Sequence, residues 1–487
     1  MNIPELGVGI IYFPGFENVL ASNPDLIQVI EIEPQTFWYR YKSGLDSFVY
    51  DAEKVNYLKS LHKPLLFHGV GYPIGGTVMP NADHLPCLKK MMTELQPIWM
   101  SEHLSFNTLN INEIPYNTNF LLPPLQTQEG IERISASIRS YASHFDMPFA
   151  FETGTNYLSP KKFELDDGYF VDQLALQSET YILFDIHNLL ANHKNGRQPV
   201  FDYLKQVSHE KIIQIHLAGG FYFKNYYLDA HSNVSSDEVL DVFEKTVELL
   251  PNLKAVTFEM GADYLNFIPE KAIRKQLEKM NTIWEKRGKK QKGHQPAYNS
   301  AIPPDQYLPD MSEWEQQVGL LALGREIPVR TALTDELEMD KGFEIIRDLI
   351  EKFKGSAIVS ALKLTCRYIM LYYSVDELNQ LLKIFWETDV PKLFASDNGI
   401  DFADFLLHRE ELKNNDLLMD LTTYEKKSLL TLLDQTQRDV KMTFDPTEII
   451  PFLAEYKLPE SLHRGNYIIT LTPEEKFSEN IQTVFHS

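Results

Sequence analysis

Eight short apolar runs recur along the first 260 residues, and a His, Asp or Glu lies at or near the end of most of them. Short runs rich in β-branched and aromatic residues predict buried strands, and the longer amphipathic stretches between them predict helices. Eight successive strand–helix units predict a closed (β/α)8 TIM barrel. The runs are VGII (8–11), QVIEIE (28–33), PLLFHG (64–69), WMSEH (99–103), PFAFET (148–153), YILFDI (181–186), IIQIHL (212–217) and AVTFEM (255–260).

The pattern changes character after residue 286. A basic stretch is followed by a segment rich in proline and polar residues, which predicts a linker over residues 288–310. A long loop inside one domain is the alternative. We therefore expect a barrel domain over residues 1–287 and a mostly helical domain over residues 311–487.

The second half shows helical spacing and one strand. Ser374 with Glu377, and Thr422 with Glu425, have the spacing of capping boxes and predict two helix starts. The segment NYIITLT (466–472) predicts a strand. Four aromatic residues of this half are expected to lie in the helical core: Phe385, Trp386, Phe402 and Phe405.

Composition limits the classes of partner. The chain has 487 residues and a formal net charge of -22, which disfavours binding to nucleic acid or to an anionic membrane surface. The two cysteines, Cys87 and Cys366, form no disulfide framework and fit a reducing, cytoplasmic environment. We read no signal peptide at the amino terminus and no apolar run long enough to span a bilayer.

The polar residues that end the strands are the candidate chemistry. Because the carboxyl ends of barrel strands converge on one mouth, these side chains are expected to share one cavity. Each alone has an ordinary explanation, as a hydrogen-bonded core residue or a helix cap. Together they predict a site for more than one metal ion, since each buried carboxylate costs several kcal/mol without a compensating cation. They are His68, Glu102, His103, Glu152, Asp185, Asn188, His216, Asp229, His231 and Glu259.

The donor types alone leave the metal and the reaction open. Imidazole and carboxylate ligands without thiolate suit iron, manganese or zinc. A divalent-metal sugar isomerase and a phosphoesterase of the apurinic-endonuclease type would both place such residues at strand ends, although the acidic charge disfavours the latter. A non-catalytic peptide-binding module is a further alternative.

Several motifs resemble those of the multinuclear nonheme iron-dependent oxidases. SEHLSF (101–106) and IHLAGG (215–220) are the most specific of them, and the resemblance covers about residues 5–285. It implies a xylose-isomerase-like barrel that holds two or three iron ions. It also implies an enzyme that uses dioxygen to modify cysteine in a ribosomally made precursor peptide.

Carried over by motif, the resemblance implies three groups of ligands. These are His68, His103 and Glu152; then Asp185, His216 and Glu259; then Asn188, Asp229 and His231. Glu102 and His187 are the candidates for acid–base catalysis.

The chain also departs from the family pattern. Thr153 follows Glu152 where Asn is usual, His187 replaces an Asn, Gln35 and Thr36 replace an early Glu-Asn pair, and Met260 replaces a Trp. His187 could be an additional ligand, a residue that supports a ligand, or simply a helix-start residue.

The resemblance also suggests a role for the second half of the chain. Family members commonly work with a separate protein that binds the leader of the precursor peptide. Residues 311–487 could supply that recognition on the same chain, which would raise the local concentration of substrate. A stabilising or oligomerising domain is the alternative.

Overall fold

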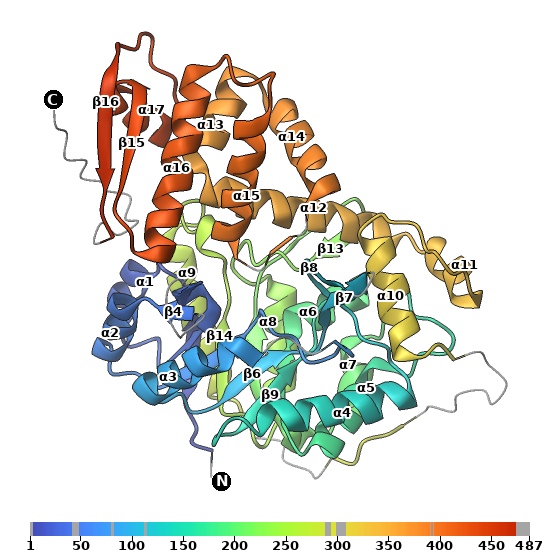
Figure 1. Ribbon diagram of the computed structural model, residues 1–487. Helices are drawn as coiled ribbons and strands as arrows, with labels where there is room; N and C mark the ends of the chain where they lie inside the picture. Colours follow the sequence, from blue (N-terminus) through green and yellow to red (C-terminus); the bar gives the residue numbers. More distant parts are fainter. Residues whose placement is uncertain are drawn as a thin grey trace. The chain divides into compact units, whose positions relative to one another are not determined.

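The structure is a computed structural model that describes residues 3–40, 48–78, 82–111, 114–287, 294–298, 308–389, 391–392 and 394–473. The chain divides into two compact units (Figure 1). The first comprises Met1–Trp38 and Tyr50–Asp348, and the second comprises Tyr39–Val49 and Leu349–Ser487.

The first unit contains a closed barrel of eight parallel strands, which confirms the predicted fold class. Neighbouring strands in the barrel are also neighbours along the chain, and each of the eight apolar runs forms one of them. They are β1 (Gly7–Ile11), β2 (Val29–Ile32), β5 (Leu65–Gly69), β6 (Met100–His103), β9 (Phe149–Glu152), β10 (Tyr181–Asp185), β11 (Ile212–Leu217) and β14 (Ala255–Phe258).

Helices alternate with these strands along the chain, as the amphipathic stretches predict. The α-helices are α1 (Glu17–Ser22), α2 (Ala52–Ser60), α3 (Leu85–Leu95), α4 (Gln128–Ala142), α5 (Asp167–Ser178), α6 (Ile186–Lys194), α7 (Val200–Gln206), α8 (Asp237–Val247) and α9 (Glu270–Trp284). Short 3-10 helices are η1 (Pro34–Phe37), η2 (Ala82–His84), η3 (His209–Lys211) and η4 (Ala262–Tyr264).

Within the described part of the barrel loops there are three small two-stranded sheets, which the sequence pattern did not predict. They pair β3 (Trp38–Arg40) with β4 (Phe48–Tyr50), β7 (Phe106–Ile111) with β8 (Ile114–Leu122), and β12 (Phe221–Phe223) with β13 (Tyr226–Leu228). β12 and β13 connect β11 to the loop that carries Asp229 and His231, so this hairpin positions two of the candidate ligands.

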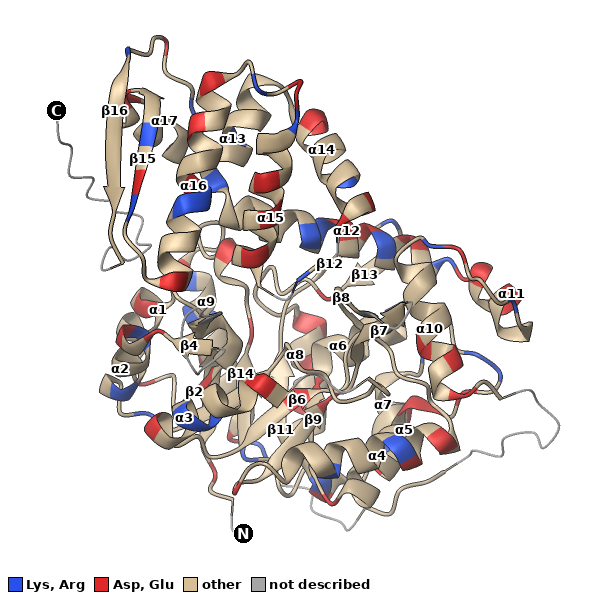
Figure 2. Ribbon diagram, viewed as in Figure 1, with Lys and Arg blue, Asp and Glu red and all other residues tan. Residues whose placement is uncertain are grey.

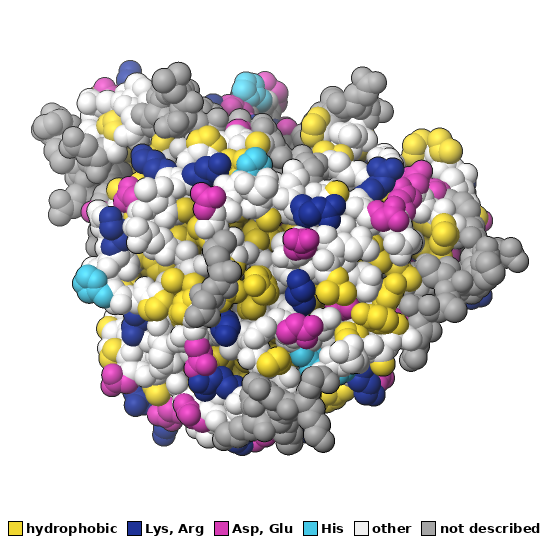
Figure 3. Space-filling model, turned by 90° about the horizontal axis from the view of Figure 1, so that it is seen from below, with side chains coloured by type: hydrophobic (Ala, Val, Ile, Leu, Met, Phe, Trp, Pro, Cys, Tyr) yellow, Lys and Arg dark blue, Asp and Glu magenta, His cyan; other side chains and the backbone are white. Residues whose placement is uncertain are grey.

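The two ends of the barrel differ in polarity. At the amino ends of the strands, residues such as Val29, Leu66, Trp99 and Ile213 form a buried apolar cluster. Apolar side chains also gather between charged ones on the surface seen from below (Figure 3). At the carboxyl ends the interior is polar. Apolar packing thus closes one end of the barrel, and the chemistry is confined to the other.

The helices α10 (Met311–Ala322) and α11 (Ala332–Glu338) belong to the first unit, although the sequence pattern predicted a separate helical domain from residue 311. Trp314 Nε1 donates a hydrogen bond to the carbonyl of Pro123 at 2.9 Å, and the Glu315 carboxylate accepts one from the Thr77 amide at 2.7 Å. The change of pattern marks where strands stop alternating with helices. It does not mark where contacts with the barrel stop, and the boundary between the units lies inside α12 (Gly342–Ala361). Most of the predicted linker lies outside the described residues.

The second unit is mainly helical. It contains α13 (Lys363–Tyr372), α14 (Val375–Thr388), α15 (Ala395–His408), α16 (Asp416–Asp434), α17 (Pro446–Ala454) and an antiparallel pair, β15 (Arg438–Phe444) and β16 (Arg464–Leu471). The predicted strand is confirmed as β16, whereas β15 was not predicted. Phe385 and Phe402 are buried in its core, and Trp386 and Phe405 pack against that core. Phe48, from the early segment, packs against Phe394 in a tilted arrangement with ring centroids 5.4 Å apart.

Acidic and basic residues are interspersed along the elements of each unit (Figure 2). Among the described helices, none is both long enough and apolar enough to cross a bilayer.

One of the two predicted helix starts is wrong. Ser374 begins α14 as expected, and its hydroxyl accepts a hydrogen bond from the Glu377 amide at 3.0 Å. Thr422 instead lies inside α16 and donates to the Leu418 carbonyl at 2.7 Å. Glu425 caps a different helix, because its carboxylate accepts hydrogen bonds from the amides of Leu364 and Thr365 at 2.7 and 2.8 Å.

This buried cap should make the second unit sensitive to pH. Burial raises the pKa of Glu425 to about 7. Because the folded pKa exceeds the unfolded value, the folded state binds the additional proton, and the free energy of unfolding should fall by up to about 3 kcal/mol between pH 4.5 and 7. Glu425→Gln should flatten that slope in urea titrations, whereas Glu387→Gln, at an exposed position of α14, should retain it. An unchanged slope in Glu425→Gln would contradict the assignment.

Candidate metal centre

The candidate ligands lie at the carboxyl ends of six barrel strands. His103, Glu152 and Asp185 are the last residues of β6, β9 and β10, His68 and His216 are the next-to-last residues of β5 and β11, and Glu259 directly follows β14. Pairing between strands places these residues at the same level along the barrel axis. His103 is the register partner of Glu152, and Asp185 is the register partner of His216. Neighbouring strands are about 4.8 Å apart, so such partners are close enough to share an ion.

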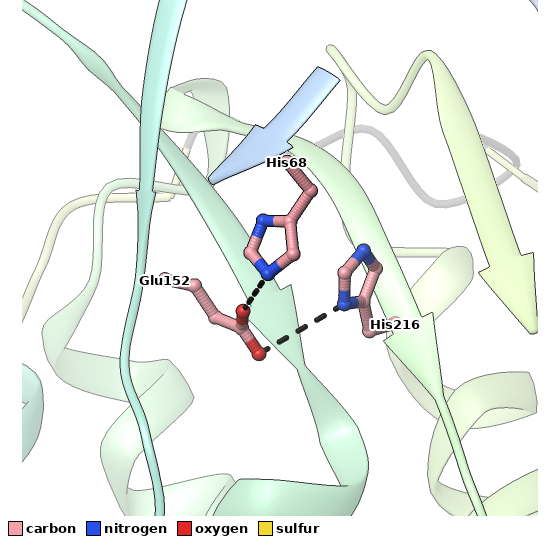
Figure 4. Close-up of side chains that lie close together, drawn as sticks. All are labelled: His68, Glu152 and His216. Carbon is pink, nitrogen blue, oxygen red and sulfur yellow. Dashed lines mark ion pairs between the residues drawn. The ribbon is translucent and has the colours of Figure 1, made fainter. Parts of the chain in front are cut away.

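Glu152 contacts three histidines. Its Oε2 lies 3.1 Å from His68 Nε2 and 3.4 Å from His103 Nε2. Its Oε1 lies 3.8 Å from His216 Nδ1 (Figure 4). The other nitrogens of the first two rings are held by the protein: His68 Nδ1 bonds the Ser101 hydroxyl at 2.8 Å, and His103 Nδ1 bonds the Gly69 carbonyl at 3.0 Å. Both rings therefore present Nε2 to the same carboxylate.

A second group is formed around His216. Its Nδ1 lies 3.4 Å from Glu259 Oε2 and 3.9 Å from Asp185 Oδ2. Asp185 also begins α6, because its Oδ1 accepts a hydrogen bond from the Asn188 amide at 2.7 Å. One carboxylate oxygen of Asp185 thus caps the helix, and the other faces the cavity.

A third group comes from the loop after β13 and from the first turn of α6. His231 Nδ1 lies 3.0 Å from Glu259 Oε1, and His231 Nε2 lies 2.8 Å from Asp229 Oδ1. His187 Nε2 approaches the same oxygen of Asp229 to 3.6 Å. The three groups are continuous, since Glu259 contacts both His216 and His231.

The buried polar atoms fit bound cations. In native proteins nearly all buried polar atoms have hydrogen-bond partners, so unpartnered ones call for an explanation. Among the buried polar atoms without another hydrogen-bond partner, six belong to this cluster, where their contacts are ion pairs: Glu152 Oε2, Asp185 Oδ2, His187 Nε2, His216 Nδ1, Asp229 Oδ1 and His231 Nε2. Imidazole nitrogens and carboxylate oxygens in this arrangement have the donor set of a transition-metal site.

The charges of the cluster also fit bound cations. Burial lowers the pKa of His68, but the hydrogen bond and the charge of Glu152 outweigh it and raise the pKa to about 9. Burial, together with the charge of Glu152, holds the pKa of Asp185 well above its usual range. Without cations, protons on the imidazole rings and on Asp185 therefore neutralise much of the negative charge of the cluster. Cations would replace those protons, because only deprotonated ligands bind metal.

Asn188 makes hydrogen bonds on both sides of its amide. Its Nδ2 donates to Glu152 Oε1 at 3.1 Å, and its Oδ1 accepts from the Thr155 hydroxyl at 2.9 Å. Both ends of the amide are therefore used. The structure places Asn188 beside Glu152, where it orients the carboxylate, and it places His187 beside Asp229.

The two acid–base candidates have different surroundings. Glu102 alternates with Ser101 and His103 on β6, so it lies on the face of the strand opposite to the cluster, and its Oε1 accepts from the His103 amide at 2.9 Å. Burial raises the pKa of Glu102 to about 8. His187 is fully buried within the third group, and burial lowers its pKa to about 4.

Two glutamates of β2 and the loop after it were not singled out from the sequence. Glu31 Oε2 accepts hydrogen bonds from His216 Nε2 at 2.9 Å, Gln214 Nε2 at 2.8 Å and Thr257 Oγ1 at 2.7 Å. The pKa of Glu33 is raised to about 7 by burial and by the charge of Glu259. The sequence feature that could have identified them is the spacing in QVIEIE. Its two acids are two residues apart, so they lie on the same face of an otherwise apolar run.

Most of the first unit is similar to a known family of proteins. The family described as the RiPP precursor modification enzyme MbnB/TglH/ChrH matches residues 7–284. A UPF0276 protein of Psychromonas ingrahamii is 28% identical over 246 residues, covering 49% of this chain and 81% of its own. A UPF0276 protein of Caulobacter vibrioides is 25% identical over 231 residues, covering 47% and 78%.

Among solved structures, D-psicose 3-epimerase in the presence of D-fructose matches with a TM-score of 0.36 and 10% identity, over 57% of this chain and 99% of its own. L-ribulose 3-epimerase matches with a TM-score of 0.34 and 13% identity, over 58% and 92%.

Proposed function

Because the chain belongs to the MbnB/TglH/ChrH family of RiPP precursor modification enzymes, we propose that it is an iron-dependent oxidase acting on a ribosomally made precursor peptide. Two or three iron ions would be bound at the barrel mouth. Dioxygen would be the co-substrate, and cysteine the residue modified.

One observation carries the proposal: the unpartnered buried atoms of the centre are imidazole nitrogens and carboxylate oxygens, with no thiolate among them. Pairs of imidazoles with a carboxylate and open positions suit ferrous iron that reacts with oxygen. An all-oxygen set would have favoured magnesium or calcium. The donor set thus supports a redox-active ion in a family of peptide-modifying enzymes.

The residues of this chain would hold and shield the reacting groups. Bound iron would supply the binding of sulfur and dioxygen and the transfer of electrons. Ser101 and Gly69 fix the rings of His68 and His103, and Asn188 fixes the carboxylate of Glu152. The buried apolar cluster at the amino ends of the strands closes the opposite end of the barrel and would exclude water on that side.

We further propose that the helical second half, residues 311–487 in the sequence-based division, recognises the leader of the precursor peptide. A recognition domain on the same chain would make core binding intramolecular and raise its effective concentration. The construction of this half, a helical core with one antiparallel strand pair, is compatible with peptide binding by strand addition.

The full chain should be tested with a peptide. We expect protein loaded with Fe²⁺ under argon to consume oxygen and to change the mass of a cysteine-containing precursor encoded beside its gene. A peptide in which Ser replaces Cys should stay unmodified, and a leaderless peptide should react about 100-fold more slowly at low concentration. Activity with zinc or manganese and without oxygen would instead support a sugar isomerase or a phosphoesterase. Tight peptide binding without any turnover would support a binding module.

A further inference from the structure

The β12–β13 hairpin adjoins the metal centre without belonging to it. Three residues separate the hairpin from the carboxyl end of β11, and Asp229 directly follows its last residue, Leu228. Lys224 and Asn225 at its turn have φ values of 45° and 69°, and two successive positive φ values are what a two-residue type I′ turn requires. The hairpin is therefore a short, preformed sheet next to the centre.

One edge of this small sheet is closed by a side chain. The Asn195 amide group donates a hydrogen bond to the Tyr227 carbonyl at 2.9 Å and accepts one from the Tyr227 backbone amide at 2.8 Å. These are the two bonds that a neighbouring strand would make. Asn195 thus takes the place of a third strand on the β13 side of the hairpin.

The other edge, formed by β12, is open. Tyr222 is the register partner of Tyr227, and opposite residues of an antiparallel pair exchange either both hydrogen bonds or neither. Because Tyr227 directs its amide and carbonyl to Asn195, Tyr222 directs its own away from β13, to the outer edge of β12. No residue in the described part of the chain forms a backbone hydrogen bond with these two groups.

The side chains of β12 fit an apolar partner. Phe221 is 44% exposed and Tyr222 is 60% exposed, and they lie on opposite faces because successive residues of a strand alternate. The ammonium group of Lys194 lies 5.8 Å from the ring centre of Tyr222, but it is paired with Glu238 at 2.6 Å. Recognition at this edge would therefore depend on backbone hydrogen bonds and apolar contacts, as in peptide binding by strand addition.

We propose that β12 is the docking strand for the core of the precursor peptide. The core would add to the open edge through the amide and carbonyl of Tyr222, and its apolar side chains would contact the rings of Phe221 and Tyr222. The choice of a peptide as the occupant rests on the proposed function, and the family of this chain modifies precursor peptides.

Continuity with the metal centre favours this occupant. Gly220, two residues before Tyr222, passes so close to the ring of His187 that a Cβ there would lie 2.7 Å from His187 Cε1. An extended peptide advances about 3.3 Å per residue. A peptide paired with Tyr222 would therefore bring a residue about two or three positions away to the centre. The residues on that side of the modified cysteine would determine specificity.

The test compares two substitutions of one residue. Tyr222→Pro removes the outward N–H, and proline is tolerated in an edge strand at such a position. Tyr222→Thr removes the same ring but keeps the N–H. The quantity measured is the dissociation constant of a fluorescently labelled core peptide, made without its leader so that leader binding elsewhere does not mask the difference. The full chain is used, loaded with Fe²⁺ under argon.

We expect Tyr222→Pro to bind the core peptide about 3–10-fold more weakly than Tyr222→Thr, as loss of one hydrogen bond predicts. Tyr222→Thr should itself bind more weakly than the unmodified chain, because it lacks the aromatic ring. Leu176→Ala, at an exposed position of α5 close to the amino end of β10, is the matched control and should bind normally.

A second measurement does not depend on the folding of a proline variant. The backbone amides of the core peptide are methylated one at a time, and binding to the unmodified chain is measured. One methylated position within about three residues of the cysteine should weaken binding, because its N–H can no longer donate to the Tyr222 carbonyl.

The outcomes separate this inference from the proposed function. Equal affinities of folded Tyr222→Pro and Tyr222→Thr, no sensitive amide near the cysteine, or no peptide binding by the unmodified chain would each overturn the inference. So would a dimer of the unmodified chain that Tyr222→Pro dissociates in sedimentation velocity, because the edge would then pair two copies. The expected affinities support the inference even if the peptide is never oxidised, and in that case the proposed function alone fails.

Discussion

Glu152→Gln is expected to remove most of the metal from the centre and to lower any peptide turnover by more than about 100-fold. The carboxylate contacts His68, His103 and His216, and its Oε2 has no other partner. An amide is neutral and presents a donor to at least one of these rings, so it cannot balance the charge of a cation there. Loss of a residue that merely supports a ligand already costs about 10–100-fold in metal affinity, and loss of the ligand should cost more.

The measurement is metal per chain after anaerobic loading, followed by oxygen uptake with the precursor peptide. Glu129→Gln, on the exposed side of α4, is the matched control and should load normally. Full metal loading in Glu152→Gln would show that Glu152 is not a metal ligand. It would also leave no explanation for the orientation of the three histidines toward one carboxylate.

Glu31→Ala should have the next largest effect, although the ring of His216 lies between Glu31 and the rest of the centre. Its carboxylate accepts from His216 Nε2, which directs His216 Nδ1 toward Asp185 and Glu259. A carboxylate behind a ligating histidine fixes its orientation and raises its basicity. Without it, metal affinity should fall about 10–100-fold, and the unpaired donors of His216 and Gln214 should also reduce stability.

Orientation can be separated from packing with a second variant of the same hydrogen-bond group. Thr257→Val removes one donor to Glu31 but leaves the bond between Glu31 and His216 in place. We expect it to lower stability while keeping metal affinity within about threefold of normal, since the ligand orientation is retained. If Thr257→Val weakens metal binding as much as Glu31→Ala, Glu31 acts through packing alone.

The barrel and most of the centre could be predicted because parallel strand geometry converts position along the chain into position in space. A residue at the end of one strand must lie near residues at the ends of its neighbours. His68, His103, Glu152 and His216 were therefore found without any knowledge of side-chain contacts. The same reasoning does not identify Glu31, because an acid inside a strand is not marked by the pattern of strand ends.

Local contacts were harder to predict, because a residue of a given type can form the same kind of contact with several different partners. Asn188 and His187 are adjacent on α6, and the sequence does not show which of them faces Asp229. Glu425 has the spacing of a capping box, yet it caps a helix that is distant in sequence. The position of α10 depends on single contacts such as that of Trp314 with Pro123, which leave no periodic signal.

The grouping of residues 39–49 with the second unit has a consequence for synthesis of the protein. Phe48 leaves the ribosome early, whereas Phe394, whose ring it contacts, is made after the whole barrel. At roughly 5–20 residues per second, the delay is on the order of tens of seconds. During that interval the nascent chain lacks this aromatic contact. A polypeptide cut short after α9 would lack it permanently.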